Sequence, residues 1–220
     1  MKSEKEDDDK SDKQDKRLTK KENTESKKAL FIQRFIAFCI DILIISFITS
    51  FVVFPFYDGE NSTKLNEEAN RVITSYYNEE ISFNEYLDEF MSISYQLAKN
   101  DGLIALVGII IEILYFVVYQ LYKNGQTIGK KLMKIKVISI KNELTMNQMI
   151  FRALLINSIL LELISFGFML FSSKEVYFYG VGIFEIIQSI IIVSSALMIM
   201  YSKNSRGIHD LVTHTEVIKL

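Results

Sequence analysis

Four long apolar runs restrict the folding of this chain more than any other feature of its sequence. They cover about residues 29–54, 103–122, 150–171 and 179–201, and each contains few charged residues. A helix rises about 1.5 Å per residue, so each run is long enough to cross a hydrocarbon layer of about 30 Å. A soluble bundle would need a polar face on every helix, and these runs are apolar almost all round. The sequence therefore predicts an all-α integral membrane protein built as a four-transmembrane-helix bundle.

The segment before the first run has a different composition. Residues 1–28 hold ten basic and nine acidic residues and almost no large apolar ones. Such a segment cannot bury enough surface to offset its ordering entropy, so we expect a disordered, charged cytoplasmic tail in front of a membrane domain at 29–220. Because its charges nearly cancel, we expect no nucleic-acid partner.

The distribution of basic residues in the connections predicts the orientation. Lysine and arginine are retained on the cytoplasmic side of a membrane, whereas acids contribute little. The outer loop 55–102 is acidic, and 172–178 holds a single lysine, whereas 123–149 holds six lysines and the segment after Tyr201 three basic residues. We therefore expect a multi-pass protein of the cell membrane with both termini in the cytoplasm and anionic lipid headgroups as partners at the inner face.

Two connections contain periodic patterns of their own. In the outer loop, two sets of apolar residues recur at helical spacing, and Ser82 with Glu85 forms a capping-box pattern before the second set. We expect two amphipathic helices, so that the extracytoplasmic loop is helical. Short alternating segments at 135–140 and 215–220 predict two strands that pair as a small cytoplasmic β-element.

Several acids fall within the apolar runs, where ionisable residues are costly and usually functional. Counted from the cytoplasmic end of each run, Asp41, Glu112 and Glu162 lie at a similar depth, and Arg34 is close to the start of the first run. Clustered carboxylates in a medium of low dielectric constant can exchange a proton for a cation. The alternative is that each acid pairs with an arginine or a hydroxyl group and only orders the bundle.

The sequence offers few residues for disulfide formation, metal binding, catalysis or phosphate binding. Cys39 is the only cysteine, His209 and His214 lack the neighbours of a metal site, and no nucleophile with its base stands out. The block 124–131 resembles a phosphate-binding loop but has the wrong glycine spacing and no preceding strand, so we expect a basic turn at the headgroups. We expect neither an enzyme nor a bound metal or cofactor.

Taken together, an ordered set of motifs resembles the RDD family of membrane proteins. The family takes its name from an arginine, an aspartate in the first helix and a second aspartate, which here match Arg34, Asp41 and Asp210. The other matching residues are Gly125, Gln126, Thr127, Gly129, Lys130, Arg152, Arg206 and His209. Relatives usually carry a glycine where His214 stands, so we expect the turn there to differ.

The resemblance implies one function and leaves another open. Some members of the family are reported to support cation/proton antiport, which makes a transporter or transporter subunit plausible, with Asp41 proton-linked, Glu112 and Glu162 as accessory acids, and Arg34 tuning Asp41. Four helices are few for a complete pathway, so this reading also predicts a homo-oligomer. The alternative is a non-catalytic scaffold or accessory protein of the envelope that uses its lysine-rich inner surface.

Overall fold

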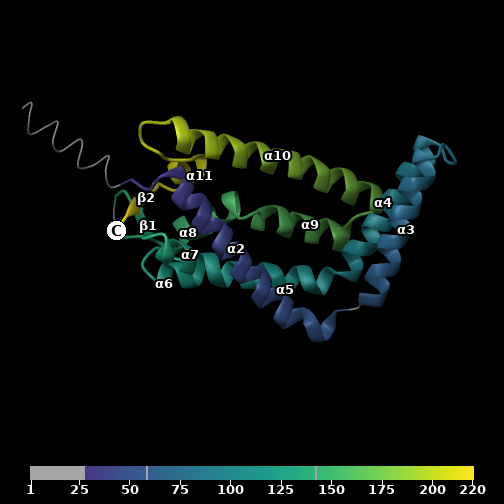
Figure 1. Cartoon of the computed structure of the whole chain (residues 1–220), viewed down its shortest axis with the longest axis horizontal. Helices are drawn as coiled ribbons and strands as arrows, with labels where there is room; N and C mark the ends of the chain where they lie inside the picture. The colour runs from purple at the N-terminus through teal and green to yellow at the C-terminus, as the bar shows by residue number, and fades with distance from the viewer. Residues whose placement is uncertain (1–27, 58, 142) are drawn as a thin grey trace, which may run out of the picture.

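The structure, a computed structural model, describes residues 28–57, 59–141 and 143–220 (Figure 1). The predicted disordered tail lies outside these residues, except for Lys28. That residue forms an isolated antiparallel β-bridge with Ile218.

A bundle of long helices connects two differently built ends (Figure 1). Three helical stretches are long and apolar enough to cross a membrane, and a bent pair of helices counts as a fourth if it is one span. The first stretch is α2 (Phe31–Val53) with the 3₁₀ turn η1 (Phe54–Phe56), and the last is α10 (Lys174–Tyr201). The second is one continuous stretch made of α5 (Gly102–Ile113), the π-helical segment η2 (Leu114–Tyr119) and α6 (Gln120–Tyr122).

Large apolar side chains cover the outside of these helices. On α2, Leu43, Phe47 and Phe51 are 70–77% exposed, and α10 presents Ile186 and Ile190 in the same way. Exposure of such an apolar surface to water is unfavourable, whereas lipid tails are as apolar as these side chains. The outward faces therefore support the prediction of a membrane protein.

The third apolar run is not the continuous helix that the sequence predicts over 150–171. It forms α8 (Met146–Ile156) and α9 (Ile159–Phe171), which are bent by 72° relative to each other. Ser158 has a positive φ of 60°, a left-handed conformation that interrupts the helix between Asn157 and Ile159. Hydropathy does not report such a break, because both halves are apolar.

The segment predicted as the outer loop forms the two helices that the sequence predicts, α3 (Gly59–Tyr77) and α4 (Phe83–Asn100), which together make a helical hairpin. The Ser82 hydroxyl accepts a hydrogen bond from the Glu85 amide at 3.3 Å, and the Glu85 carboxylate accepts one from the Ser82 amide at 2.8 Å. These bonds confirm the capping box. The hairpin lies at one end of the bundle, which we call the hairpin end (Figure 1).

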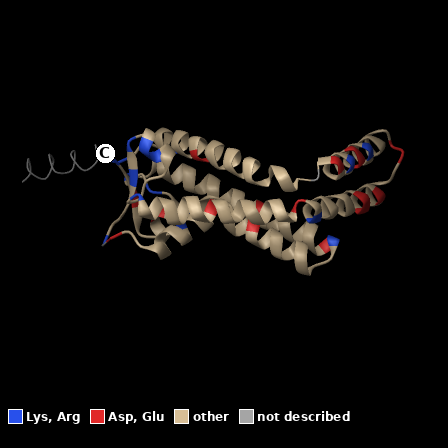
Figure 2. Cartoon of the chain, turned by 90° about the horizontal axis from the view of Figure 1, so that it is seen from below, with Lys and Arg blue, Asp and Glu red and all other residues tan. Residues whose placement is uncertain are grey.

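The opposite end, the strand end, holds the small sheet and two short helices beside it. Strands β1 (Ile135–Ser139) and β2 (Thr215–Lys219) are antiparallel, with Val137 opposite Val217, which confirms their predicted pairing. The short helices are α7 (Ile128–Leu132) and α11 (Ile208–Val212), and α8 begins beside them. Lysine and arginine gather at this end (Figure 2).

Candidate functional site

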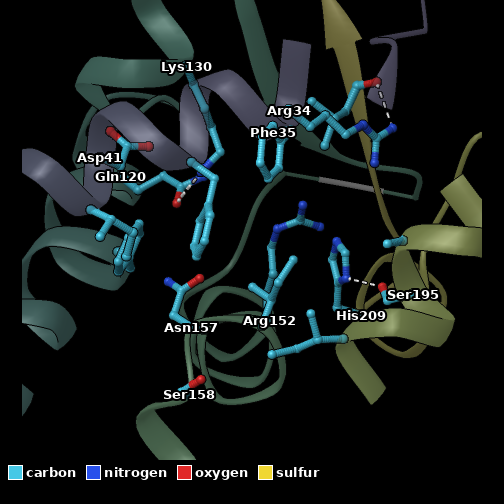
Figure 3. A pocket seen from close by; sticks show the side chains of 18 of the residues that line it. Arg34, Phe35, Asp41, Gln120, Lys130, Arg152, Asn157, Ser158, Ser195 and His209 are labelled. Atoms are coloured by element: carbon cyan, nitrogen blue, oxygen red, sulfur yellow. Dashed lines mark hydrogen bonds between the residues drawn. The ribbon is translucent and has the colours of Figure 1, made fainter. Parts of the chain in front are cut away.

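A cavity of about 550 Å³ lies inside the bundle, on the side of the strand end (Figure 3). Its walls come from α2, the second helical stretch, α7, α8, α9, α10, α11 and both strands. It brings together predicted site residues that are far apart in the sequence: Arg34, Asp41, Glu112, Lys130, Arg152, Glu162 and His209.

Asp41 is the most completely satisfied acid of the cavity. It is 1% exposed and accepts hydrogen bonds from the Tyr115 hydroxyl at 2.6 Å, the Thr127 hydroxyl at 2.5 Å and the Gly129 amide at 2.7 Å. Hydrogen bonds of this kind favour a charged carboxylate, which is costly to bury without them. The basic turn predicted at 124–131 is therefore a clamp that holds the side chain of Asp41 from the strand end.

Glycine is required at two positions of this clamp. A side chain on Gly129 would place its Cβ 2.1 Å from the Ala37 carbonyl oxygen, so only glycine allows α7 to approach α2 so closely. Gly125 has a φ of 87°, and its Cβ would meet the Val137 carbonyl oxygen at 2.0 Å. Gln126 donates from its side-chain amide to the Ile135 carbonyl at 3.0 Å, which fastens the turn to β1.

Asp210 forms the second centre of charge. Its carboxylate is fully buried and pairs with the Arg34 guanidinium at 2.7 Å and with that of Arg152, which comes from α8. Burial by itself would raise the pKa of Asp210, but Arg152, His209 and Arg34 together hold it below its ordinary value. Two of the three residues that give the resemblance its name, Arg34 and Asp210, are thus partners of each other.

The other bonds of this centre reach the backbone and a hydroxyl. Arg34 donates to the Ser205 carbonyl at 2.6 Å, and Arg152 donates to the Thr215 hydroxyl at 2.9 Å. Asp210 also accepts from the Gly207 amide at 3.1 Å. The centre therefore ties α2, α8 and the segment around α11 to the start of β2.

His209 is buried beside this centre and is 2% exposed. Its Nδ1 lies 2.8 Å from the Ser195 hydroxyl, and its Nε2 lies 3.4 Å from Asp210 (Figure 3). Burial, reinforced by the charge of Arg152, lowers the pKa of His209 to about 3, so the ring is neutral at physiological pH. The Ser195 hydroxyl also accepts a bond from the Ile208 amide at 3.1 Å, so these contacts tie α10 to α11.

Lys130 points into the cavity from α7, whereas its neighbour Lys131 is exposed (Figure 3). Its ammonium group donates to the Gln120 side chain at 3.2 Å and forms no salt bridge with any residue that the structure describes. Burial lowers the pKa of Lys130 to about 8, although Asp41 acts in the opposite direction. This lysine is thus charged at neutral pH and loses its proton readily above it.

Glu112 and Glu162 line the deeper part of the cavity. Unlike Asp41 and Asp210, neither carboxylate has an ion pair or hydrogen bond within 28–57, 59–141 and 143–220, and Glu112 Oε2 is buried with no partner. Glu162 is in the first turn of α9, just after the break at Asn157 and Ser158, which also line the cavity. The break therefore places the N-terminus of α9 within one helical turn of Glu162.

The structure connects the predicted residues in a way that the sequence does not suggest. Arg34 was expected to tune the charge of Asp41, but it pairs with Asp210 instead. Tyr115 and Ser195 were not predicted as site residues, and the only signal for them is their polar groups inside apolar runs. Arg206 is half-buried, its Nε has no partner among the described atoms, and it does not line the cavity.

Within the described parts of the chain, no group of three or more His, Cys, Asp or Glu side chains is close enough to hold a metal ion. His214 adopts a left-handed φ of 51°, the conformation that a glycine favours. The turn therefore holds a histidine in a backbone conformation that glycine favours.

Comparison with known proteins identifies the family of the chain. No curated protein and no solved structure matches the chain. The family model described as RDD family matches residues 28–214, which include the clamp around Asp41, the charged residues Arg34, Arg152 and Asp210, and every residue that lines the cavity except Val217. The chain therefore belongs to the RDD family of membrane proteins.

Proposed function

We propose that the chain is a subunit of a proton-coupled cation transporter in which Glu112 and Glu162 form the exchange site. One observation carries the proposal: two carboxylates without a basic partner among the described residues line the same internal cavity. Unpaired carboxylates at this depth in a bilayer are expensive and are retained mainly where an ion or proton binds.

The exchange would be competitive. Either carboxylate can hold a proton, and a cation that enters the cavity binds between the two only after the proton has left. Broken membrane helices supply ion sites in known transporters, because their free termini can face a cavity within the bilayer. The break between α8 and α9 gives this chain the same kind of element next to Glu162.

Asp41 has a different role in this proposal from the one predicted. Its carboxylate already accepts hydrogen bonds from Tyr115, Thr127 and Gly129, so both of its oxygens are engaged within the clamp. Asp41 would therefore hold the clamp in place rather than carry the transported proton. A bundle of so few helices is small for a complete ion pathway. We therefore also propose that the active form is a homo-oligomer.

The test uses the full chain in proteoliposomes that enclose a pH-sensitive dye. Addition of sodium or lithium outside should move protons in the wild type, and Glu112→Gln or Glu162→Gln should reduce the rate at least tenfold. Glu185→Gln is the matched control, because Glu185 is an exposed acid of α10 that does not line the cavity. Equal rates in all four proteins, or no cation-dependent proton movement in the wild type, would eliminate the exchange site.

A specific observation also favours the second candidate, a non-catalytic module that binds anionic lipid surfaces or envelope partners. Lys123, Lys131 and Lys134 are exposed, and lysine and arginine gather at the strand end (Figure 2). If replacing these three lysines by glutamine abolishes the cellular function while Glu112→Gln and Glu162→Gln leave it intact, this second function is correct.

A further inference from the structure

The walls of the cavity near the strand end are mostly apolar and face an empty space. On α2, Phe31, Phe35, Phe38 and Ile42 follow one another at helical spacing along the cavity, and α10 contributes a matching stripe across it. Phe35 is 51% exposed and Ile192 of α10 is 37% exposed, so these stripes are not closed off by packing. A chain-shaped apolar ligand therefore has a path along α2 and α10.

Three cations lie at one end of this path: Arg34, Lys130 and Arg152 (Figure 3). Asp210 is shared by the two arginines, and the ammonium group of Lys130 has only uncharged partners among the described residues, the Gln120 side chain and, at 6.0 Å, the Phe116 ring. In addition, Arg34 Nε is buried and has no hydrogen-bond acceptor within the described part of the chain. The end of the path thus offers unused donors to an anion beside three cations, whose charge Asp210 and Asp41 compensate in part.

We propose that the cavity binds one anionic phospholipid from the leaflet at the strand end. Its phosphate lies between Lys130 and the two arginines, and one acyl chain follows the apolar stripes of α2 and α10. A soluble anion would use the donors but leave the apolar stripes uncovered, whereas a lipid satisfies both. The cavity volume of about 550 Å³ is also in the usual range for sites of small ligands.

This inference does not depend on the proposed transport, because it concerns occupancy of the apolar part and not of the glutamate pair. Native mass spectrometry of the detergent-solubilised full chain, titrated with phosphatidylglycerol or phosphatidylcholine, counts bound lipid without any ion gradient. We expect one tightly bound phosphatidylglycerol and at least tenfold weaker binding of phosphatidylcholine.

The headgroup contact is tested with Lys130→Gln, which should weaken phosphatidylglycerol binding about tenfold, the value of one charge-assisted hydrogen bond. Lys203→Gln is the matched control, because Lys203 is exposed just after α10 and does not line the cavity. It should leave the affinity unchanged.

The acyl path is tested with Ala196→Phe, which fills the space in front of the α10 stripe. Leu197→Phe is its control, because Leu197 is 49% exposed on the outer face of the same helix. The first variant should bind phosphatidylglycerol at least tenfold more weakly, and the second should bind it as the wild type does. Melting temperatures of all variants are compared in parallel. If Ala196→Phe does not fold, the binding of phosphatidylglycerol by Lys130→Gln tests the proposal.

Three outcomes would overturn the proposal: equal binding of the two lipids, equal effects of Lys130→Gln and Lys203→Gln, or competition by glycerol 3-phosphate as strong as that by the lipid. The last result would show that the cations bind a soluble phosphate and that the apolar stripes are not used. A loss of proton movement without any change in bound lipid would concern the transport proposal alone.

Discussion

Asp210 accepts two guanidinium groups at once, so its removal would leave both without a counter-charge. Arg34 and Arg152 side chains are only 11% and 8% exposed, and buried charges are tolerated only when they are paired. The arrangement makes a single carboxylate responsible for the contact between α2, α8 and the segment that carries α11. The same dependence does not apply to Glu85 or to the other acids of the hairpin, which lie at the surface.

We predict that Asp210→Asn lowers the free energy of unfolding by roughly 3–5 kcal/mol, the usual cost of breaking a buried ion pair. Titration of the purified protein with a denaturing detergent, followed by circular dichroism, measures the change. Asp88→Asn is the control, because the Asp88–Lys174 bridge is exposed and should contribute less than about 1 kcal/mol. Similar losses in the two variants would contradict the central role of Asp210.

His209 predicts how stability depends on pH. Its pKa is about 3 in the folded chain, and the ordinary value is near 6.5, so the unfolded chain takes up the proton first as the pH falls. The contribution of His209 is therefore complete above pH 6.5 and is lost towards pH 3, by about 1.4 kcal/mol per pH unit. The charged groups that shift the pKa of the His209 ring are those of Arg152, Asp210, Arg34 and Lys130. The variant His209→Asn keeps all four of them.

The measurement compares the stability of wild type and His209→Asn from pH 7 to pH 4. The variant should show a flatter curve, because asparagine does not titrate in this range. His214→Asn is the matched control, because it replaces the other histidine of the chain, which is exposed. Parallel curves for wild type and His209→Asn would refute the assignment.

At the scale of elements, the clamp between α7 and α2 depends on close contact. The segment from Gly125 to Gly129 leads to α7, which lies against the first half of α2. Its donors satisfy Asp41 only because α7 approaches the Ala37 carbonyl without a side chain between them. The motif is therefore a packing and capping device rather than a phosphate site. Of the two lysines that follow Gly129, Lys130 lines the cavity and Lys131 is exposed.

Gly129→Ala should lower the free energy of unfolding by about 1–3 kcal/mol, because a methyl group would collide with the backbone of α2. Gly167→Ala in α9 is the control: nothing lies within 4 Å of its added Cβ, so we expect a change within about 1 kcal/mol. Thermal unfolding in detergent, with both variants side by side, gives the comparison. A tolerated alanine at 129 would mean that α7 and α2 are farther apart than described.

At the scale of the whole molecule, composition and periodicity predict most of the architecture but few of its contacts. The apolar runs, the two amphipathic helices and the pairing of β1 with β2 follow from local patterns of hydrophobicity, which the folded chain retains. The break at Ser158 depends on one backbone angle, and the choice of Asp210 over Asp41 as the partner of Arg34 depends on tertiary packing. Neither leaves a periodic signal in the sequence.

The predicted orientation can be tested on the whole chain in intact cells. Cys39→Ser removes the only cysteine, and Glu80→Cys or Lys131→Cys then adds one at the hairpin end or the strand end. A membrane-impermeant maleimide should label position 80 from outside and position 131 only after permeabilisation, because lysine-rich ends stay in the cytoplasm. The opposite labelling would invert the topology.

The pairing of Arg34 with Asp210 also has a consequence for the order of assembly. The two residues are separated by 176 positions, and β1 likewise pairs with a strand translated much later. During synthesis, the first helix thus enters the bilayer with an arginine whose counter-ion does not yet exist. We expect the early helices to stay loosely associated, in contact with the insertion machinery or with lipid phosphates, until translation delivers the aspartate that locks them together.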